Sequence, residues 1–208
     1  EELPEKPRAR DAELLPSRVD LFSTDFQSQW SVMHGTFLDT QAEFVVHCVD
    51  WILQQYSHLP EGDRPRKVLV IGHSMGGGLD DVSLVMGDRS TPLPVDAVIT
   101  IGTPHLLPPF PLEQTTTVLY SELNSFWSAN KDGALKNVTI ASISGGLSDS
   151  NVISELSELP SSIMRSDRVV YAISENIPFV WRGITHVWLV RGRHLLDVVA
   201  RMTFELLN

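Results

Sequence analysis

The sequence predicts an α/β fold in which helices cover both faces of a mostly parallel sheet. Short apolar runs bounded by turn residues occur at residues 67–71, 96–102, 137–145 and 168–174. Continuous apolar runs of this length are typical of parallel strands that are buried on both faces. Segments with helical patterns separate these runs. The alternation of strands and helices is the pattern that parallel sheets require.

The composition fits one globular domain. The chain has 208 residues, of which 42% are hydrophobic and 20% charged, and this is enough to build a substantial core. Residues 1–18 are charged and rich in proline, so we expect an arm or linker there and a single domain over 19–208. The net charge of -10 argues against nucleic acid as a partner, because phosphate binding needs a basic surface. No apolar run approaches the roughly 18 residues that a transmembrane helix needs.

The first half of the predicted domain contains one strand and one long helix. Residues Val19–Phe26 alternate apolar and polar residues, which predicts a strand. A helix is expected from about Thr40 to Ser57, with Thr40 and Glu43 at capping-box spacing. Within that helix Phe44, Cys48 and Ile52 repeat every four residues, which predicts the apolar stripe that faces the core.

Three further helices are expected. One begins at about Met75, one spans Glu113 to Asn130, and a long amphipathic helix closes the chain from His186 to Leu207. The intervening segment "TPHLLPPFPLEQ" contains too many prolines for regular structure.

The segment "GHSMG", from Gly72 to Gly76, matches the pattern G-x-S-x-G and falls between a buried strand and a helix. In that context the pattern is typical of a sharp turn that lifts a nucleophilic serine, here Ser74, above the sheet. We expect Gly72 and Gly76 to lie where a β-carbon would clash. The N–H of Met75 could then stabilise an oxyanion. His73 is expected to have a structural or pocket-lining role. The alternative is a glycine-rich turn with no chemistry.

A nucleophilic serine needs a base, and the base needs an acid to orient it. In this arrangement the acid follows the serine in the chain and the histidine follows the acid. Asp149 comes after a strand and two glycines, which favours it as the acid. Asp132, before that strand, and Asp167, before the next one, are its rivals.

His186 lies between the last strand and the closing helix, so it is favoured as the base. His194 lies inside the helix, and His105 precedes the acid. Asp80 and Asp81 are expected to face solvent rather than to bind a metal, and no pattern for a metal or an organic cofactor occurs.

Several segments together resemble one family. They are "STDFQSQWSVMHGTFLDTQAEFV", "GHSMGG", "AVITIGTPHLLPP", "SISGGLSDSNV" and "IPFVWRGITHVWLV", in this order. Their order and spacing resemble the eukaryotic GPI inositol-deacylases, from about Val19 to the C-terminus.

This resemblance implies an α/β-hydrolase domain in the lumen of the endoplasmic reticulum, carried by a longer membrane protein through segments absent from this chain. It implies ester hydrolysis that removes a fatty acyl chain from the inositol of a GPI anchor, without a metal or cofactor. The family's nucleophile, acid and base fall on Ser74, Asp149 and His186. The loop with Pro104, His105 and Leu106 could line an acyl pocket.

One departure leaves alternatives open. The family has a strand and a "PGN-x-G"-like loop before the segment that matches Val19, and that loop would donate the second oxyanion hydrogen bond. Residues 1–18 contain no glycine, so the family's N-terminal strand and this loop are expected to be absent. The alternatives are an esterase or lipase of the same fold with another lipid substrate, and a non-catalytic hydrolase-like fragment with an incomplete oxyanion hole.

Overall fold

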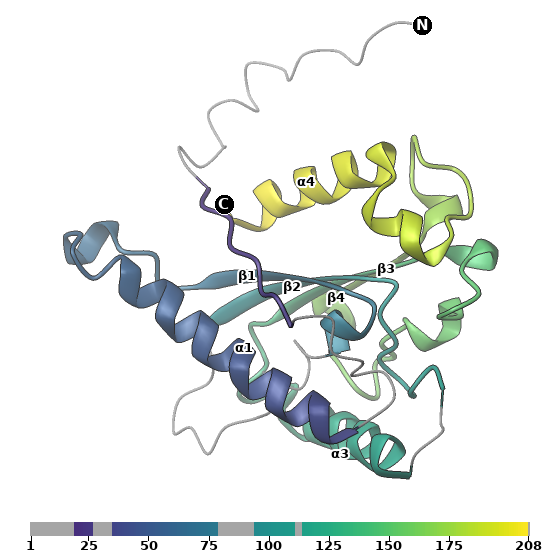
Figure 1. Cartoon of the computed structure of the whole chain (residues 1–208), viewed down its shortest axis with the longest axis horizontal. Helices are drawn as coiled ribbons and strands as arrows, with labels where there is room; N and C mark the ends of the chain where they lie inside the picture. Colours follow the sequence, from purple (N-terminus) through teal and green to yellow (C-terminus); the bar gives the residue numbers. More distant parts are fainter. Residues whose placement is uncertain (1–18, 27–34, 79–93, 111–113, 208) are drawn as a thin grey trace, which may run out of the picture.

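The described part of the structure is built around a four-stranded parallel sheet. The structure is a computed structural model that describes residues 19–26, 35–78, 94–110 and 114–207. The strands are β1 (Val68–His73), β2 (Val95–Ile101), β3 (Thr139–Ser144) and β4 (Val169–Ile173), in the order β1-β2-β3-β4 (Figure 1). Every pair of neighbouring strands is parallel. The predicted α/β class is therefore confirmed.

Helices cover both faces of this sheet. α1 (Gly35–Gln55) and α3 (Gln114–Asn130) lie below the sheet in Figure 1, and α4 (Arg193–Leu207) lies above it. Short 3-10 turns occupy the connections, namely η2 (Glu61–Asp63), η3 (Gly146–Ser148), η4 (Ser154–Leu156), η5 (Ser166–Arg168), η6 (Ser174–Asn176) and η7 (His186–Val190). The predicted helix at Glu113–Asn130 is confirmed to within one residue at its start.

The sheet separates two hydrophobic cores. Because neighbouring side chains of a strand point to opposite faces, Val98 of β2 and Ile140 of β3 pack on one side with Val49 of α1 and Trp127 of α3. Ile99, Ile101, Ala141 and Ile143 pack on the other side with Leu195 and Val199 of α4. The central strands are thus buried on both faces, as their continuous apolar sequences predict.

The strand predicted at Val19–Phe26 is wrong. These residues have no regular secondary structure and pair with none of the four strands. Their aromatic residues instead contact the outer side of α1: the ring of Phe22 meets that of Trp51 edge-on, and the ring of Phe26 meets that of Phe44. An alternating pattern gives a segment one apolar and one polar face, but it does not supply a partner strand.

The apolar stripe predicted for α1 is also wrong. Phe44 is 45% exposed, and Cys48 and Ile52 are only half-buried. The buried face carries Ala42, Val45, Val46 and Val49 instead. Their spacing of three and four residues follows the helical repeat better than a strict four-residue step does. The helix also begins at Gly35 rather than at Thr40.

The long closing helix is interrupted. Residues His186–Val190 form the 3-10 turn η7, and α4 begins only at Arg193, after Gly192. The N–H of Gly192 donates to the carbonyl oxygen of Trp188 at 2.7 Å, which closes the turn. This interruption keeps His186 outside the helix, at the end of a loop.

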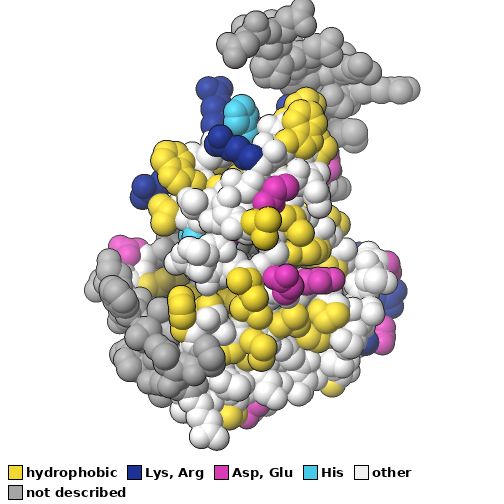
Figure 2. Space-filling view, turned by 90° about the vertical axis from the view of Figure 1, so that its right-hand side faces the viewer, with side chains coloured by type: hydrophobic (Ala, Val, Ile, Leu, Met, Phe, Trp, Pro, Cys, Tyr) yellow, Lys and Arg dark blue, Asp and Glu magenta, His cyan; other side chains and the backbone are white. Residues whose placement is uncertain are grey.

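The side of the molecule that carries the loops after β3 and β4 is shown in Figure 2. None of the helices in the described ranges is long and apolar enough to cross a membrane.

Candidate active site

The residues singled out from the sequence meet beyond the carboxyl ends of the strands, where ligands bind in open parallel sheets. Ser74 follows β1, Asp149 follows β3 and the turn η3, and His186 begins η7 after β4. Ser74 and His186 are 112 residues apart in the chain. The parallel order of the strands brings them to one edge.

Ser74 occupies a strained turn. Its φ of 57° lies in the left-handed region, which a residue with a β-carbon adopts at a cost. Its N–H donates to the carbonyl oxygen of Ile101 at 2.9 Å, so β2 holds the turn in place. Helical geometry begins at Met75 directly after the turn. The Met75 N–H is in the first helical turn, where N–H groups have no intrahelical acceptor.

The three side chains form a continuous hydrogen-bonded series. The Nε2 atom of His186 lies 2.7 Å from the Oγ of Ser74, and its Nδ1 atom lies 2.8 Å from Oδ2 of Asp149. A carboxylate only accepts hydrogen bonds, so Nδ1 carries the proton and Nε2 accepts from the serine hydroxyl. His186 is 8% exposed and Asp149 is 3% exposed, so water competes little for these bonds. This arrangement can accept a proton from Ser74 as the serine attacks a carbonyl carbon.

Asp149 is oriented by its own backbone neighbours. Its Oδ1 accepts the N–H groups of Asn151 at 2.9 Å and Val152 at 3.0 Å, which leaves Oδ2 directed at His186. The rivals lie elsewhere: both Asp132 and Asp167 bind the guanidinium of Arg165 at the surface.

Glycines let the loops that carry the acid and the base approach each other. A β-carbon at Gly145 would lie 2.7 Å from the Cβ of Asp149, and the N–H of Ile184 donates to the Gly145 carbonyl at 2.8 Å. Gly102, with φ of 58°, leaves room on the other side: a β-carbon there would lie 3.3 Å from the ring of His186.

Gly76, one of the two glycines expected to lie where a β-carbon would clash, differs from the prediction. A β-carbon at Gly76 would meet no atom of the described residues within 4 Å, so the expected clash at this position is wrong. The close contact lies one residue later. A β-carbon at Gly77 would lie 2.8 Å from Cγ2 of Thr103, on the loop after β2.

Sequence reasoning missed two contacts of the site. The Nε2 atom of His73 lies 3.1 Å from the carbonyl oxygen of His186, and the two rings lie 4.8 Å apart. Burial and the neighbouring His186 lower the pKa of His73, so it is neutral at neutral pH. Glu175 accepts the N–H of Leu147 at 3.2 Å and thereby supports the turn before Asp149. No local pattern marks either contact, because both join distant segments.

The two rival histidines are not members of the hydrogen-bonded series. His105 is buried, and its Nε2 lies 2.9 Å from Oγ1 of Thr100. His194 is exposed on α4. Asp80 and Asp81 lie outside the described residues. Within the part of the chain that is described, His, Cys, Asp and Glu side chains form no group of three or more that could hold a metal.

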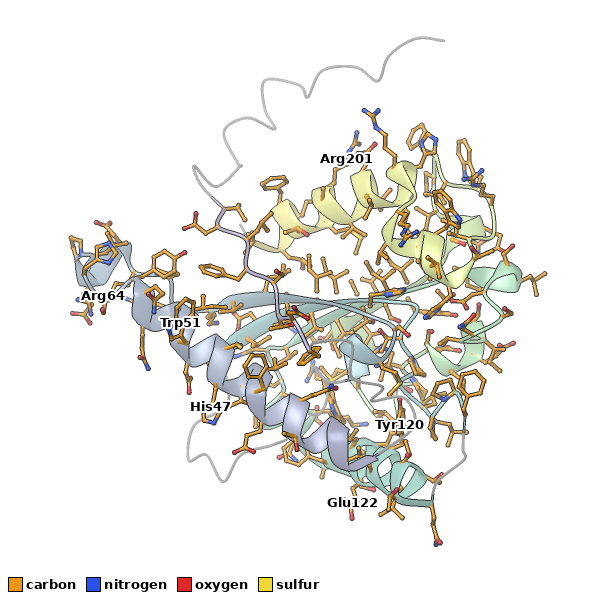
Figure 3. All side chains as sticks on the ribbon, viewed as in Figure 1. His47, Trp51, Arg64, Tyr120, Glu122 and Arg201 are labelled. Atoms are coloured by element: carbon orange, nitrogen blue, oxygen red, sulfur yellow. The ribbon has the colours of Figure 1, made fainter. Side chains whose placement is uncertain are left out.

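A narrow pocket of about 10 Å³, which is room for about one water molecule, lies beside Met75, the residue after Ser74. Met75 and Gly78 form one wall, Pro104 and His105 another, and α3 supplies the floor with Leu119, Tyr120, Leu123, Asn124 and Trp127. Tyr120, labelled in Figure 3, projects from α3 toward the sheet and is 4% exposed. Of the predicted pocket loop, Leu106 is not among the lining residues. Its carbonyl accepts the side-chain N–H of Asn124 at 3.0 Å.

A parallel sheet with a serine on a strained turn and a histidine and an aspartate in series defines the class of α/β hydrolases that use a serine nucleophile. Comparison with known proteins is consistent with this class. Residues 7–206 match the model of the PGAP1-like alpha/beta domain, and the chain belongs to this family.

Curated relatives cover nearly the whole chain. A GPI inositol-deacylase of Cryptococcus neoformans var. neoformans serotype D (strain B-3501A) is 30% identical over 97% of this chain and 26% of its own length. A GPI inositol-deacylase of Xenopus laevis is 32% identical over 96% of this chain and 21% of its own. The chain thus spans about a quarter of the length of these relatives. The crystal structure of MGS-MChE2, an alpha/beta hydrolase enzyme from the metagenome of lagoon sediments of Mar Chica, Morocco, is 14% identical with a TM-score of 0.47, over 81% of this chain and 69% of that one.

Proposed function

We propose that this chain is the hydrolase domain of a GPI inositol-deacylase and that Ser74, His186 and Asp149 are its catalytic triad. The observation that carries the proposal is the hydrogen-bonded series from Asp149 through His186 to Ser74, with contacts of 2.8 and 2.7 Å. The relatives named GPI inositol-deacylase support the substrate class.

The proposed reaction is a two-step ester hydrolysis. Ser74 Oγ attacks the acyl carbonyl while its proton passes to Nε2 of His186, and the Met75 N–H donates to the oxyanion that forms. The protonated His186 returns the proton to the inositol oxygen, which leaves as a hydroxyl. Water then attacks the acyl-serine by the same route and releases the fatty acid. Asp149 holds the histidine in the required tautomer throughout.

In the proposed complex the acyl chain lies over the narrow apolar pocket next to Met75. Its lining is mostly apolar, with Leu119, Leu123 and Trp127 from α3 on the floor. Burial of methylene groups against such a wall provides about 0.8 kcal/mol for each group. In this account the acyl chain enters along α3, and the inositol headgroup stays outside. We further propose that the domain faces the lumen of the endoplasmic reticulum as part of a membrane protein.

The test is hydrolysis of an inositol-acylated phosphatidylinositol in detergent micelles, with Ser74→Ala as the control. Free fatty acid and the remaining lipid are identified by mass spectrometry. The proposal predicts loss of the inositol-linked chain and retention of the glycerol-linked chains. Preferential release of the glycerol-linked chains would favour an esterase with another lipid substrate. No release by a folded chain would favour the non-catalytic fragment.

A further inference from the structure

Large apolar side chains and arginines gather around the loop that carries His186. The apolar members are Leu147, Phe179, Trp181, Val187 and Trp188, which are between 52% and 102% exposed. The cationic members are Arg182, Arg191 and Arg193, all of them exposed. We call these eight residues the arginine-aromatic surface. We propose that it docks the protein onto a phospholipid bilayer with anionic headgroups and holds the active-site mouth at the lipid surface.

The surface is continuous in the fold. The turn that carries Leu147 is tied to the segment after Trp181 by the bond from the Ile184 N–H to the Gly145 carbonyl at 2.8 Å. The rings of Phe179 and Trp181 lie 5.5 Å apart. The turn η7 carries Val187 and Trp188 directly after His186. Apolar exposure is common on proteins as single residues, whereas a cluster of this kind marks an interaction site.

The backbone holds the aromatic residues outward. Phe179 has a φ of 71° and Trp181 a φ of 44°, both in the left-handed region that bulky residues avoid. The N–H groups of Val180 and Trp181 both donate to the Ile177 carbonyl at 3.1 Å, so the conformation is fixed by hydrogen bonds. Ile177 and Val180 point into the core while their neighbours face solvent. Strain that exposes two aromatic rings is expected where those rings have a partner.

Charge identifies the partner. Residues 176–196 contain three arginines and no aspartate or glutamate, and with the flanking Glu175 and Asp197 the stretch 175–197 keeps a net charge of +1, three positive against two negative. The Glu175 carboxylate lies at this surface, where it accepts the N–H of Leu147. Figure 2 shows dark blue and cyan side chains beside yellow ones in the upper part of this side of the molecule, with magenta side chains among the yellow ones below them. Tryptophan favours the headgroup region of a bilayer, phenylalanine enters the boundary between headgroups and acyl chains, and arginine is attracted to anionic headgroups. Because ionic screening limits charge effects to about 8–10 Å, this local positive charge acts at the membrane despite the negative net charge.

Docking would also determine where the active site lies relative to the membrane. The surface begins next to His186, whose Nε2 contacts Ser74, so a docked chain would present Ser74 to esters at the membrane surface. This inference concerns binding, and it does not depend on which acyl ester is the substrate.

Vesicle flotation of the 208-residue chain tests the proposal. Vesicles of phosphatidylcholine alone are compared with vesicles that also contain phosphatidylserine, at low and high NaCl. We expect stronger binding to the anionic vesicles, weakened by salt and by about fivefold for each of Arg182→Gln, Arg191→Gln and Arg193→Gln. The double variant Trp181→Ser/Trp188→Ser should lose most of the binding.

Matched controls come from the opposite end of the molecule. Trp51→Ser removes a tryptophan that is 56% exposed on α1, and Arg64→Gln removes an exposed arginine; both residues lie at the left in Figure 3, far from the loop that carries His186. Neither variant should change binding. Ser74→Ala should bind like the parent, which separates docking from turnover.

Two results would overturn the inference. One is absence of binding by a chain whose circular dichroism shows it to be folded. The other is equal loss of binding in the Trp51→Ser control. Fluorescence quenching by brominated lipids gives a second measure that needs no folded Trp181→Ser/Trp188→Ser variant. The parent should be dimmer with brominated anionic vesicles than with the same vesicles without bromine, and this quenching should persist in Trp51→Ser.

Discussion

The ring of His73 lies 4.8 Å from the ring of His186, and its Nε2 lies 3.1 Å from the His186 carbonyl oxygen. A carbonyl accepts hydrogen bonds, so His73 donates through Nε2. The residue before the nucleophile therefore holds the main chain of the proposed base. One strand end, β1, positions both partners of the proton transfer.

His73→Phe should lower kcat by about tenfold and leave KM nearly unchanged, because a lost hydrogen bond misplaces the base without altering the pocket. His73→Gln keeps a side-chain N–H that can donate to the His186 carbonyl, and it should recover part of the rate. Steady-state hydrolysis of a p-nitrophenyl ester measures both. Equal kcat for the parent and His73→Phe would contradict the positioning role.

His73 also predicts a pH dependence of stability. Burial, reinforced by the charge of His186, lowers the pKa of His73 in the folded chain. The unfolded chain then binds the proton first as the pH falls. Its contribution to stability is therefore full above the unfolded pKa of about 6.5 and is lost as the pH falls through the lower, folded value. Urea unfolding should show a smaller decline of stability between neutral and mildly acidic pH in His73→Gln than in the parent.

Asp149→Asn should fold and lose roughly 10⁴-fold in kcat. The Asn151 and Val152 N–H groups, which bond Oδ1 at 2.9 and 3.0 Å, would hold the amide oxygen in that position. The amide NH2 then faces Nδ1 of His186 and forces the proton onto Nε2, which can no longer accept from Ser74. Retained activity with an unchanged melting temperature would contradict the assigned role of Asp149.

Gly77→Ala and Gly76→Ala form a matched pair next to the nucleophile. A β-carbon at Gly77 would clash with Thr103, which should destabilise the fold by about 1–3 kcal/mol. At Gly76 no described atom lies within 4 Å, so alanine should be neutral or stabilising by up to about 1 kcal/mol. The midpoints of urea unfolding distinguish the two. Equal effects at both positions would count against the close approach of Gly77 to the loop after β2.

Leu119→Trp should shorten the acyl chains that the pocket accepts. Leu119 is half-buried in the pocket wall, whereas its neighbour Val118 is 47% exposed and lies outside the lining. The ratio of kcat/KM for long against short p-nitrophenyl esters should fall by about tenfold in Leu119→Trp, as expected for the loss of one or two methylene sites. The ratio should stay at the parent value in Val118→Trp. A change of equal size in both variants would show that the pocket does not determine which acyl chains are accepted.

The sequence predicts the architecture well where patterns are local. The four strands follow from continuous apolar runs, although only the central β2 and β3 are buried and the edge strands β1 and β4 are half-buried. The strained turn at Ser74 follows from the glycine spacing and its strand-to-helix context. Asp149 is favoured by its place after a strand and two glycines, and His186 by its place between the last strand and the closing helix; the fold brings the two together. These features depend on short windows of sequence or on chain order alone.

Structural features that depend on contacts between residues far apart in the sequence could not be predicted. The alternation at Val19–Phe26 fits a strand, yet these residues pair with none of the four strands and their aromatic rings pack on α1. The contact of Glu175 with the turn at Leu147 joins two loops after different strands. The break at Gly192 depends on the closed turn η7, since glycine alone does not end a helix.

Labelling of the chain with a fluorophosphonate probe, beside Ser74→Ala and His186→Ala, tests the central proposal most directly. The probe reacts only with a serine whose proton a base can remove. The account predicts a single modification on Ser74 of the parent, located by peptide mass spectrometry, and none in either variant. A folded parent that remains unlabelled, or one labelled equally after His186→Ala, would contradict the proposal that Ser74, His186 and Asp149 act as a triad.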